Sequence, residues 1–120
     1  MRLRGTVPAA TALILVATTS LVRAAASSAA QGTYTMFCAE CHGRTGHGDG
    51  PGAPLLKKKP SDFTNCARMT KLSDDELAEA IKEGAGAVGR SKDMLAWKEG
   101  LDDSEIRGLV SYLRTFCRGK

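Results

Sequence analysis

The chain has 120 residues, of which 42% are hydrophobic and 25% charged, and its formal net charge is +4. This length allows one small domain whose hydrophobic core is marginal. The positive excess comes from the first 26 residues, which hold three arginines and no acidic residue; without them 14 basic residues face 13 acidic ones. The basic balance therefore gives no support to nucleic-acid binding.

Residues 1–26 have the pattern of a secretory signal peptide. Arg2 and Arg4 form a basic start, residues 5–22 are uncharged, and small residues follow at 24–26. We expect cleavage after Ala26, or as late as Ala30, and a single domain over residues 31–120. An uncleaved anchor is the alternative, but the uncharged run is barely long enough to span a membrane and contains Pro8. We therefore expect a protein of the bacterial periplasm with no membrane span after cleavage.

The first element expected after this leader is a helix over about residues 33–41. Glycine or proline then recurs through residues 43–54, which excludes regular structure there. A second helix should begin at Ser73, because Ser73 and Glu76 have the spacing of a capping box, and it should end at Gly84. Residues 84–89 are expected to be loop.

The third helix should begin at Asp102, with Glu105 three residues later. Apolar residues then recur at the spacing of one buried helix face, at Ile106, Leu109, Val110 and Leu113. Strand signals are nearly absent. The sequence predicts an all-α fold of three main helices joined by glycine-rich loops.

The pentapeptide Cys38-Ala39-Glu40-Cys41-His42 carries the strongest chemical signal. Two cysteines three residues apart and followed by histidine are typical of c-type haem attachment. On a helical turn these three side chains share one face, so both thiols and the imidazole can address one flat ligand. A dithiol redox pair would need a βαβ pattern around it, and a zinc site would need a second ligand pair. Both alternatives remain open but are disfavoured.

Several further motifs accompany the pentapeptide in chain order: Tyr34, Cys38-x-x-Cys41-His42-Gly43, Gly46-x-Gly48-x-Gly50, Pro54-Leu55-Leu56 and Tyr112-Leu113. With these motifs the chain after the leader resembles the class I cytochromes c, and in particular the small single-haem bacterial ones. In that family the first and last helices cross, so the resemblance implies that Tyr34 and Tyr112 lie near each other.

The resemblance implies one covalent haem c, with thioether bonds to Cys38 and Cys41 and with His42 on the iron. It also implies a sixth ligand, normally a methionine before the last helix. Met94 occupies that position, and we prefer it to Met69. His47 is a rival ligand, but it lies only five residues from His42 and is expected to be an exposed loop residue.

Three further expectations concern the surroundings of the haem. Leu95 follows Met94 where the family commonly has proline, so the methionine–iron bond is expected to be more labile. By resemblance, the carbonyl of Pro54 accepts the second N–H of the axial histidine. The indole of Trp97 either donates to a haem propionate or is only a core aromatic.

Cys66 and Cys117 lie outside the haem motif. In an oxidising compartment a spare pair of cysteines indicates a disulfide, and two free thiols are the alternative. Lys57-Lys58-Lys59 is the one dense charge run, read as a solvated loop or as a docking patch for an acidic partner.

With histidine and methionine both bound, the iron would have no position left for a substrate. We therefore expect a monomeric carrier of single electrons with no catalytic residue. Its partners would be transient donors and acceptors such as a periplasmic dehydrogenase or terminal oxidase. The alternatives are a haem-bearing subunit of a larger periplasmic dehydrogenase or sulfur-oxidising complex, and a haem enzyme or gas sensor with a displaceable sixth ligand.

Overall fold

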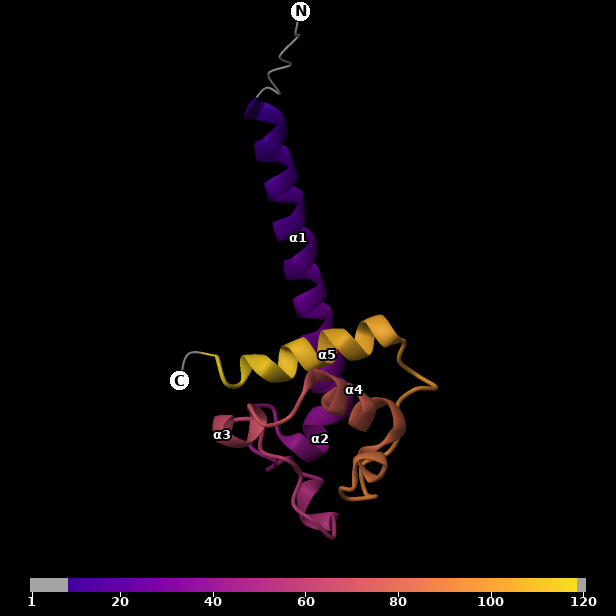
Figure 1. The fold of residues 1–120 in the computed structure, drawn as a ribbon. Helices are drawn as coiled ribbons and strands as arrows, with labels where there is room; N and C mark the ends of the chain where they lie inside the picture. Colours follow the sequence, from indigo (N-terminus) through magenta and orange to yellow (C-terminus); the bar gives the residue numbers. More distant parts are fainter. Residues whose placement is uncertain (1–8, 119–120) are drawn as a thin grey trace, which may run out of the picture.

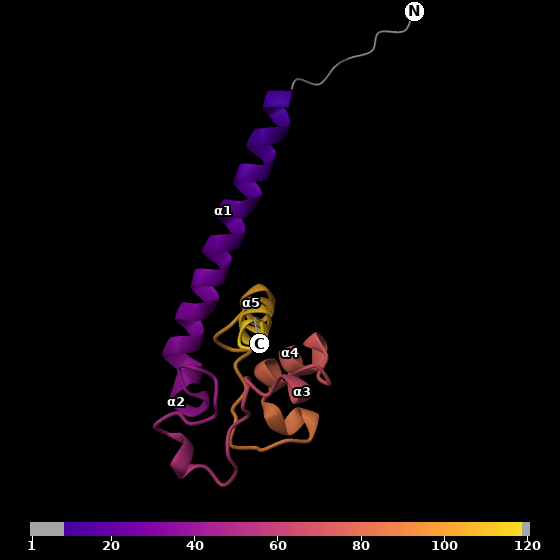
Figure 2. The ribbon, with the colours of Figure 1, turned by 90° about the vertical axis from the view of Figure 1, so that its left-hand side faces the viewer.

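The computed structural model describes residues 9–118, and their side chains from residue 19 onward. A long helix projects from a small helical domain, and no strand occurs between residues 9 and 118 (Figures 1 and 2). The all-α prediction is thus confirmed. The elements are α1 (Ala9–Thr33), η1 (Tyr34–Cys38), α2 (Ala39–His42), η2 (Ala53–Leu55), α3 (Cys66–Met69), α4 (Asp74–Glu83), η3 (Ala85–Val88) and α5 (Asp103–Thr115).

The helix expected at residues 33–41 is the end of a longer rod. α1 continues without a break into η1, a π-helical stretch, and then into α2. Residues 19–29 are exposed, and Ala30 is the first buried residue described in this rod. Part of the expected leader, residues 1–8, lies outside the described residues. Within the described part of the chain, no helix is long and apolar enough to span a membrane.

The crossing of the rod with α5 forms the centre of the core. A Cβ added to Gly108 would lie 3.7 Å from the Cβ of Ala30, so α1 and α5 approach closely there. The rings of Tyr34 and Tyr112 are 5.2 Å apart, which confirms the expected proximity. The buried residues clustered around this crossing are Tyr34, Ala39, Phe63, Met69, Leu77, Ile81, Ile106, Leu109, Val110 and Leu113.

Both predicted capping boxes are present. Ser73 and Glu76 exchange hydrogen bonds at the start of α4, and Asp102 and Glu105 do so at the start of α5. α4 ends at Gly84 as expected. The segment 84–89 differs from the expectation, because Ala85–Val88 forms a 3₁₀ turn instead of irregular loop. Short i→i+3 turns of this kind are common after helix ends.

α5 should lose about 1 kcal/mol of stabilisation when Asp102 is replaced by alanine. The Asp102 carboxylate accepts from the backbone N–H groups of Ser104 and Glu105, which have no partner within the helix. A denaturant titration of Asp102→Ala should show a lower unfolding midpoint. Ser104→Ala, on the same exposed first turn, is the control and should change the midpoint little.

Candidate functional site

The helical segment that carries the pentapeptide, η1 and α2 (residues 34–42), is called the attachment helix below. A cavity of about 370 Å³ lies between it and the chain that follows α4. In Figures 1 and 2, α2 lies on one side of the lower part of the domain and the segment after α4 on the other. The cavity is lined by the three reactive residues of the pentapeptide, Cys38, Cys41 and His42. The lining residues used below are Phe37, Cys38, Cys41, His42, Lys58, Lys59, Pro60, Ser61, Arg68, Arg90, Met94, Leu95 and Trp97.

Cys38 and Cys41 are free, partly buried cysteines on the wall of this cavity. Burial, and secondly the neighbouring Cys41, raises the pKa of the Cys38 thiol to about 11. The Cys38 side chain is therefore held as a thiol at neutral pH. The expectation that both thiols and the imidazole share one face is confirmed, since all three reach the same cavity.

His42 is fixed in orientation by two contacts. Its Nδ1 lies 3.1 Å from the carbonyl oxygen of Ser61 and donates to it, and its ring stacks on Phe63 with the centroids 4.5 Å apart. Burial lowers the pKa of His42, and the bond to Ser61 opposes that shift only in part. The imidazole is accordingly neutral, and because Nδ1 carries the proton, Nε2 presents its lone pair as a metal ligand.

The expected role of Pro54 is therefore wrong, since the structure gives this hydrogen bond to Ser61 instead. The chain from residue 43 to 52 folds back along α2, where the N–H groups of Gly48, Gly50 and Gly52 donate to the carbonyls of α2 residues 40–42. That return carries Pro54 to an exposed position in η2 and away from the imidazole. The later segment Pro60–Ser61 then passes beside His42.

Gly48 makes that passage possible. Its φ is +71°, and a Cβ there would lie 2.4 Å from the carbonyl oxygen of Pro60. No L side chain fits against a backbone oxygen at that distance, so the glycine sets how closely residues 60–61 approach the attachment helix. The glycine spacing in the sequence thus reflects a close backbone contact, and not only a flexible loop.

The three residues considered for the sixth ligand differ in location: they are Met94, Met69 and His47. Met94 lines the main cavity together with His42, whereas Met69 is 2% exposed and lies in the core. Met69 does reach a smaller cavity of about 60 Å³, which His42 and Met94 also line. His47 is exposed, with its Nδ1 3.1 Å from Thr64 Oγ1 and 3.7 Å from an Asp62 oxygen. The interpretation of His47 as an exposed loop residue is confirmed.

Trp97 lines the cavity, and its ring lies 5.6 Å from that of Phe37. It is therefore part of the cavity wall, and its contact with a propionate stays a prediction. Four residues of the site are not part of any motif in the sequence: Ser61 and Phe63 beside the imidazole, and Arg68 and Arg90 in the lining. A second proline, Pro60, was the one available sign that another segment could supply the carbonyl.

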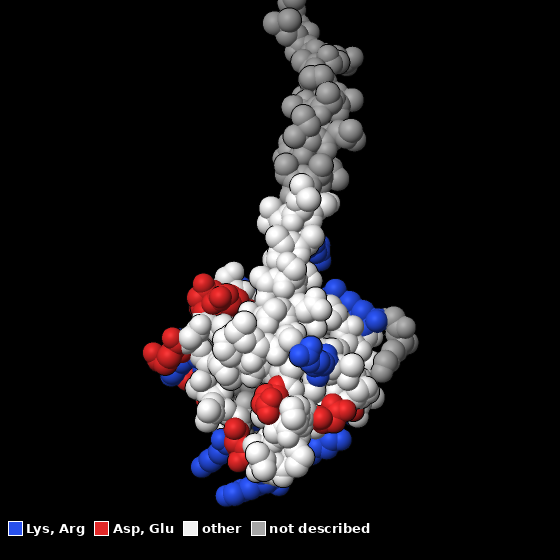
Figure 3. Space-filling view, turned by 180° about the vertical axis from the view of Figure 1, so that it is seen from behind, with Lys and Arg blue, Asp and Glu red and all other residues white. Residues whose placement is uncertain are grey.

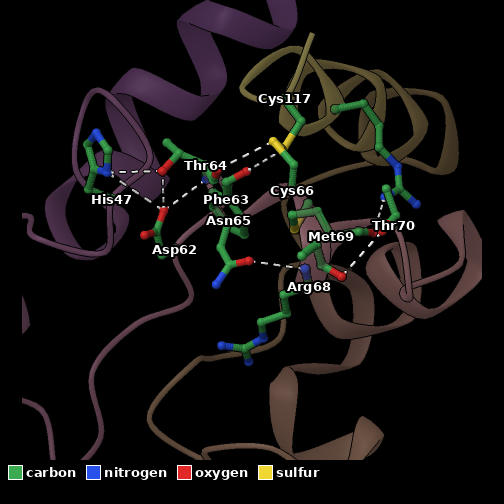
Figure 4. Close-up of a disulfide and its surroundings, with 12 residues drawn as sticks. His47, Asp62, Phe63, Thr64, Asn65, Cys66, Arg68, Met69, Thr70 and Cys117 are labelled. Carbon is green, nitrogen blue, oxygen red and sulfur yellow. Dashed lines mark hydrogen bonds and ion pairs between the residues drawn. A yellow bond between two sulfur atoms is a disulfide. The ribbon is translucent and has the colours of Figure 1, made fainter. Parts of the chain in front are cut away.

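Cys66 and Cys117 lie side by side (Figure 4), and neither residue lines the cavity. Their sulfur atoms are placed as a disulfide, and their Cα atoms are 5.4 Å apart although 51 positions separate them in the chain. This Cα distance is within the range that disulfides adopt. The pair joins the start of α3 to the chain just after α5.

The residues around the cavity fit a haem. Two free thiols stand at the attachment spacing, a neutral imidazole is oriented by its second N–H, and a thioether lies in the same lining. Aromatic and aliphatic side chains supply an apolar wall, and four basic residues suit the two carboxylates of a haem. The basic residues are Lys58, Lys59, Arg68 and Arg90.

Comparison with known proteins gives the same result. The family model described as cytochrome C oxidase, cbb3-type, subunit III matches residues 25–113. A solved structure described as "KustC0563 c-type cytochrome" is 30% identical, with a TM-score of 0.59, and the match covers 73% of this chain and 96% of that chain. No curated protein matches the sequence. The family model covers well over half of the residues of this chain. The chain therefore belongs to that family of c-type cytochrome domains, whose function is haem-based electron transfer.

Proposed function

We propose that this cytochrome is a periplasmic carrier of single electrons that holds one covalent haem c with histidine and methionine on the iron. The single observation that carries the proposal is the shared lining of one cavity by Cys38, Cys41, His42 and Met94. Helix residues supply the first three, and the segment before α5 supplies the fourth. A site closed on both sides leaves electron exchange as the remaining chemistry.

Each residue has a defined part in this proposal. Cys38 and Cys41 tether the haem through thioether bonds, while Ser61 and Phe63 keep the His42 ring in the orientation that directs Nε2 into the cavity. A haem bound here supplies reversible one-electron chemistry at its iron. Phe37 and Trp97 add two aromatic rings to the cavity lining, and an apolar surrounding together with thioether ligation favours the reduced state.

Redox partners would meet the protein at the end that carries η2. Lys57, Lys58 and Lys59 follow η2 and are exposed, and Figure 3 shows basic side chains gathered at the lower end of the domain. Two of these lysines also line the cavity. Charge on this rim would steer an acidic partner and make association sensitive to salt.

A second candidate function is that of an electron-transfer subunit within a larger periplasmic oxidoreductase. The observation that favours it is the matched family model, whose description is that of an oxidase subunit. Purification of the native protein at moderate salt distinguishes the two. A carrier elutes alone as a monomer, whereas a subunit remains with its complex.

Export and oxidation of the spare cysteines belong to the same proposal. The leader pattern of residues 1–26 supports cleavage and a periplasmic location. The proximity of Cys66 and Cys117 supports a disulfide, which such a compartment permits. The mass of the mature protein under non-reducing conditions tests both points, because cleavage and the loss of two hydrogen atoms each change it.

The assignment of the sixth ligand is tested with two matched variants, Met94→Leu and Met69→Leu. Leucine is close to methionine in volume but has no sulfur, so each variant removes a ligand and keeps most of the packing. In the oxidised protein, the weak red absorption band of methionine–iron ligation should disappear in Met94→Leu and persist in Met69→Leu. The reverse pattern would assign Met69, and a wild-type protein without the band would contradict methionine ligation altogether.

A further inference from the structure

The segment that contains Met94 lies against the C-terminal end of α4. The last carbonyls of a helix lack partners within it and need donors from elsewhere. Here the N–H of Trp97 donates to the carbonyl of Ile81 at 3.0 Å, and the N–H of Lys98 donates to that of Lys82 at 3.2 Å. The chain just after Met94 therefore serves as a cap for α4.

Met94 itself is tied to the same end of the helix. Its carbonyl oxygen accepts from the N–H of Ala85 at 3.3 Å, directly after Gly84. The ammonium of Lys98 lies 2.7 Å from the Glu83 carboxylate, which adds an ion pair between the same two segments. The backbone of residues 94–98 is thus held at several points to α4 and to the turn that follows it.

Gly84 is the position where the two backbones come closest. A Cβ there would lie 2.8 Å from the carbonyl oxygen of Met94 and 3.2 Å from the amide nitrogen of Ala96. The Gly84 backbone has φ +85° and ψ 154°, a conformation that essentially only glycine adopts. Both its conformation and its missing side chain are therefore required for Met94 to lie where it does.

We propose that Gly84 is the positioning residue for Met94, holding its backbone so that the sulfur faces the cavity. The inference deepens the proposed function and rests on Met94 being the sixth ligand. It also explains how the site manages without the proline expected after this methionine, since Leu95 stands there. The contacts with the end of α4 supply the restraint that a proline ring would have given.

The test is made on oxidised holoprotein produced with the haem-attachment machinery, using Gly84→Ala. The added methyl group must push residues 94–96 away from α4, so the red methionine–iron band should weaken or disappear. Imidazole added as a competing ligand should bind to Gly84→Ala at least about tenfold more tightly than to wild type. The backbone strain that alanine introduces weakens the competing methionine–iron bond, and the free energy of such strain corresponds to a change in affinity of this order or more.

Two control variants separate positioning from general destabilisation. Ser73→Ala removes the N-cap at the opposite end of α4, so it weakens the same helix without touching the Met94 segment. Gly89→Ala changes another glycine with positive φ, but its Cβ would meet nothing within 4 Å. Both control variants should keep the band and bind imidazole with an affinity within about twofold of wild type. This change is well below the tenfold change expected for Gly84→Ala, which corresponds to about 1.4 kcal/mol.

The inference is overturned if Gly84→Ala keeps the band with wild-type imidazole affinity, or if Ser73→Ala shows the same increase as Gly84→Ala. If Gly84→Ala yields no folded holoprotein, the variant Ala85→Pro is used to test the inference in its place. It removes the N–H that donates to Met94, and proline is well tolerated at the first position of a helical turn. Tighter imidazole binding supports the inference, and unchanged binding overturns it. Failure of the proposed function is visible separately, as a wild-type protein that lacks the band.

Discussion

Replacing Tyr34 with alanine should lower the free energy of unfolding by about 3–5 kcal/mol, among the largest effects of any single substitution in this domain. Tyr34 is only 1% exposed and lies where the attachment helix crosses α5. Its ring lies within 6.4 Å, between centroids, of the rings of Phe63, Tyr112 and Phe116. Alanine would leave a cavity at this crossing, which thermal unfolding of the holoprotein would report as a lower midpoint.

Tyr34→Phe separates the hydroxyl from the ring. The buried hydroxyl donates to the carbonyl of Gly43 at 2.7 Å, immediately after His42. Phenylalanine keeps the packing, and the Gly43 carbonyl still accepts from the N–H of Gly46 at 3.1 Å, so the lost hydrogen bond should cost about 0.5–1.5 kcal/mol. Tyr112→Phe, at a half-buried tyrosine of α5, is the control and should cost less. Equal losses in the two phenylalanine variants would argue against a specific role for the Tyr34 hydroxyl.

The same hydroxyl predicts how stability depends on pH. Burial, as the largest cause, raises the pKa of Tyr34 above its ordinary value of 10.0. The folded protein then keeps a proton that the unfolded chain releases, so this contribution is complete below pH 10.0 and declines as the pH rises above it. The stability difference between wild type and Tyr34→Phe should narrow over that alkaline range.

The features that were predicted correctly from sequence are those that depend on neighbours in the chain. Each capping box needs only a residue and its partner three positions later, so Ser73 and Asp102 could be assigned without knowing the fold. The buried face of α5 follows likewise from helical spacing. The haem pentapeptide is also local, because its three reactive side chains lie within five residues.

The errors concern contacts made across the chain. Pro54 and Ser61 both follow the haem motif, and which of their carbonyls meets His42 depends on how residues 43–52 fold back along α2. Sequence spacing carries no information on that return path. The close approach of Gly84 to Met94 is likewise a contact across the chain. In the sequence, a glycine at a helix end is already explained by its capping role, so nothing indicates that it also contacts another segment.

Converting both Cys66 and Cys117 to serine should lower the free energy of unfolding by about 4 kcal/mol, the value that the chain-entropy model gives for a loop of this length. The two positions are 51 residues apart, and the proposed disulfide between them would restrict the unfolded chain. Thermal unfolding of the double variant should show a much lower midpoint than wild type. A thiol reductant should bring wild type to the same midpoint and leave the variant unchanged.

The location of this proposed bond predicts what the double variant should retain. Cys66 and Cys117 lie beside the backbone carbonyls of Thr64 and Phe63, close in the chain to Ser61, which orients the His42 ring. Because the loss acts mainly on the unfolded chain, the native contacts of His42 remain, and the haem absorption spectrum at low temperature should match that of wild type. A spectrum already altered at low temperature would instead mean that the bond holds the histidine side of the site in place.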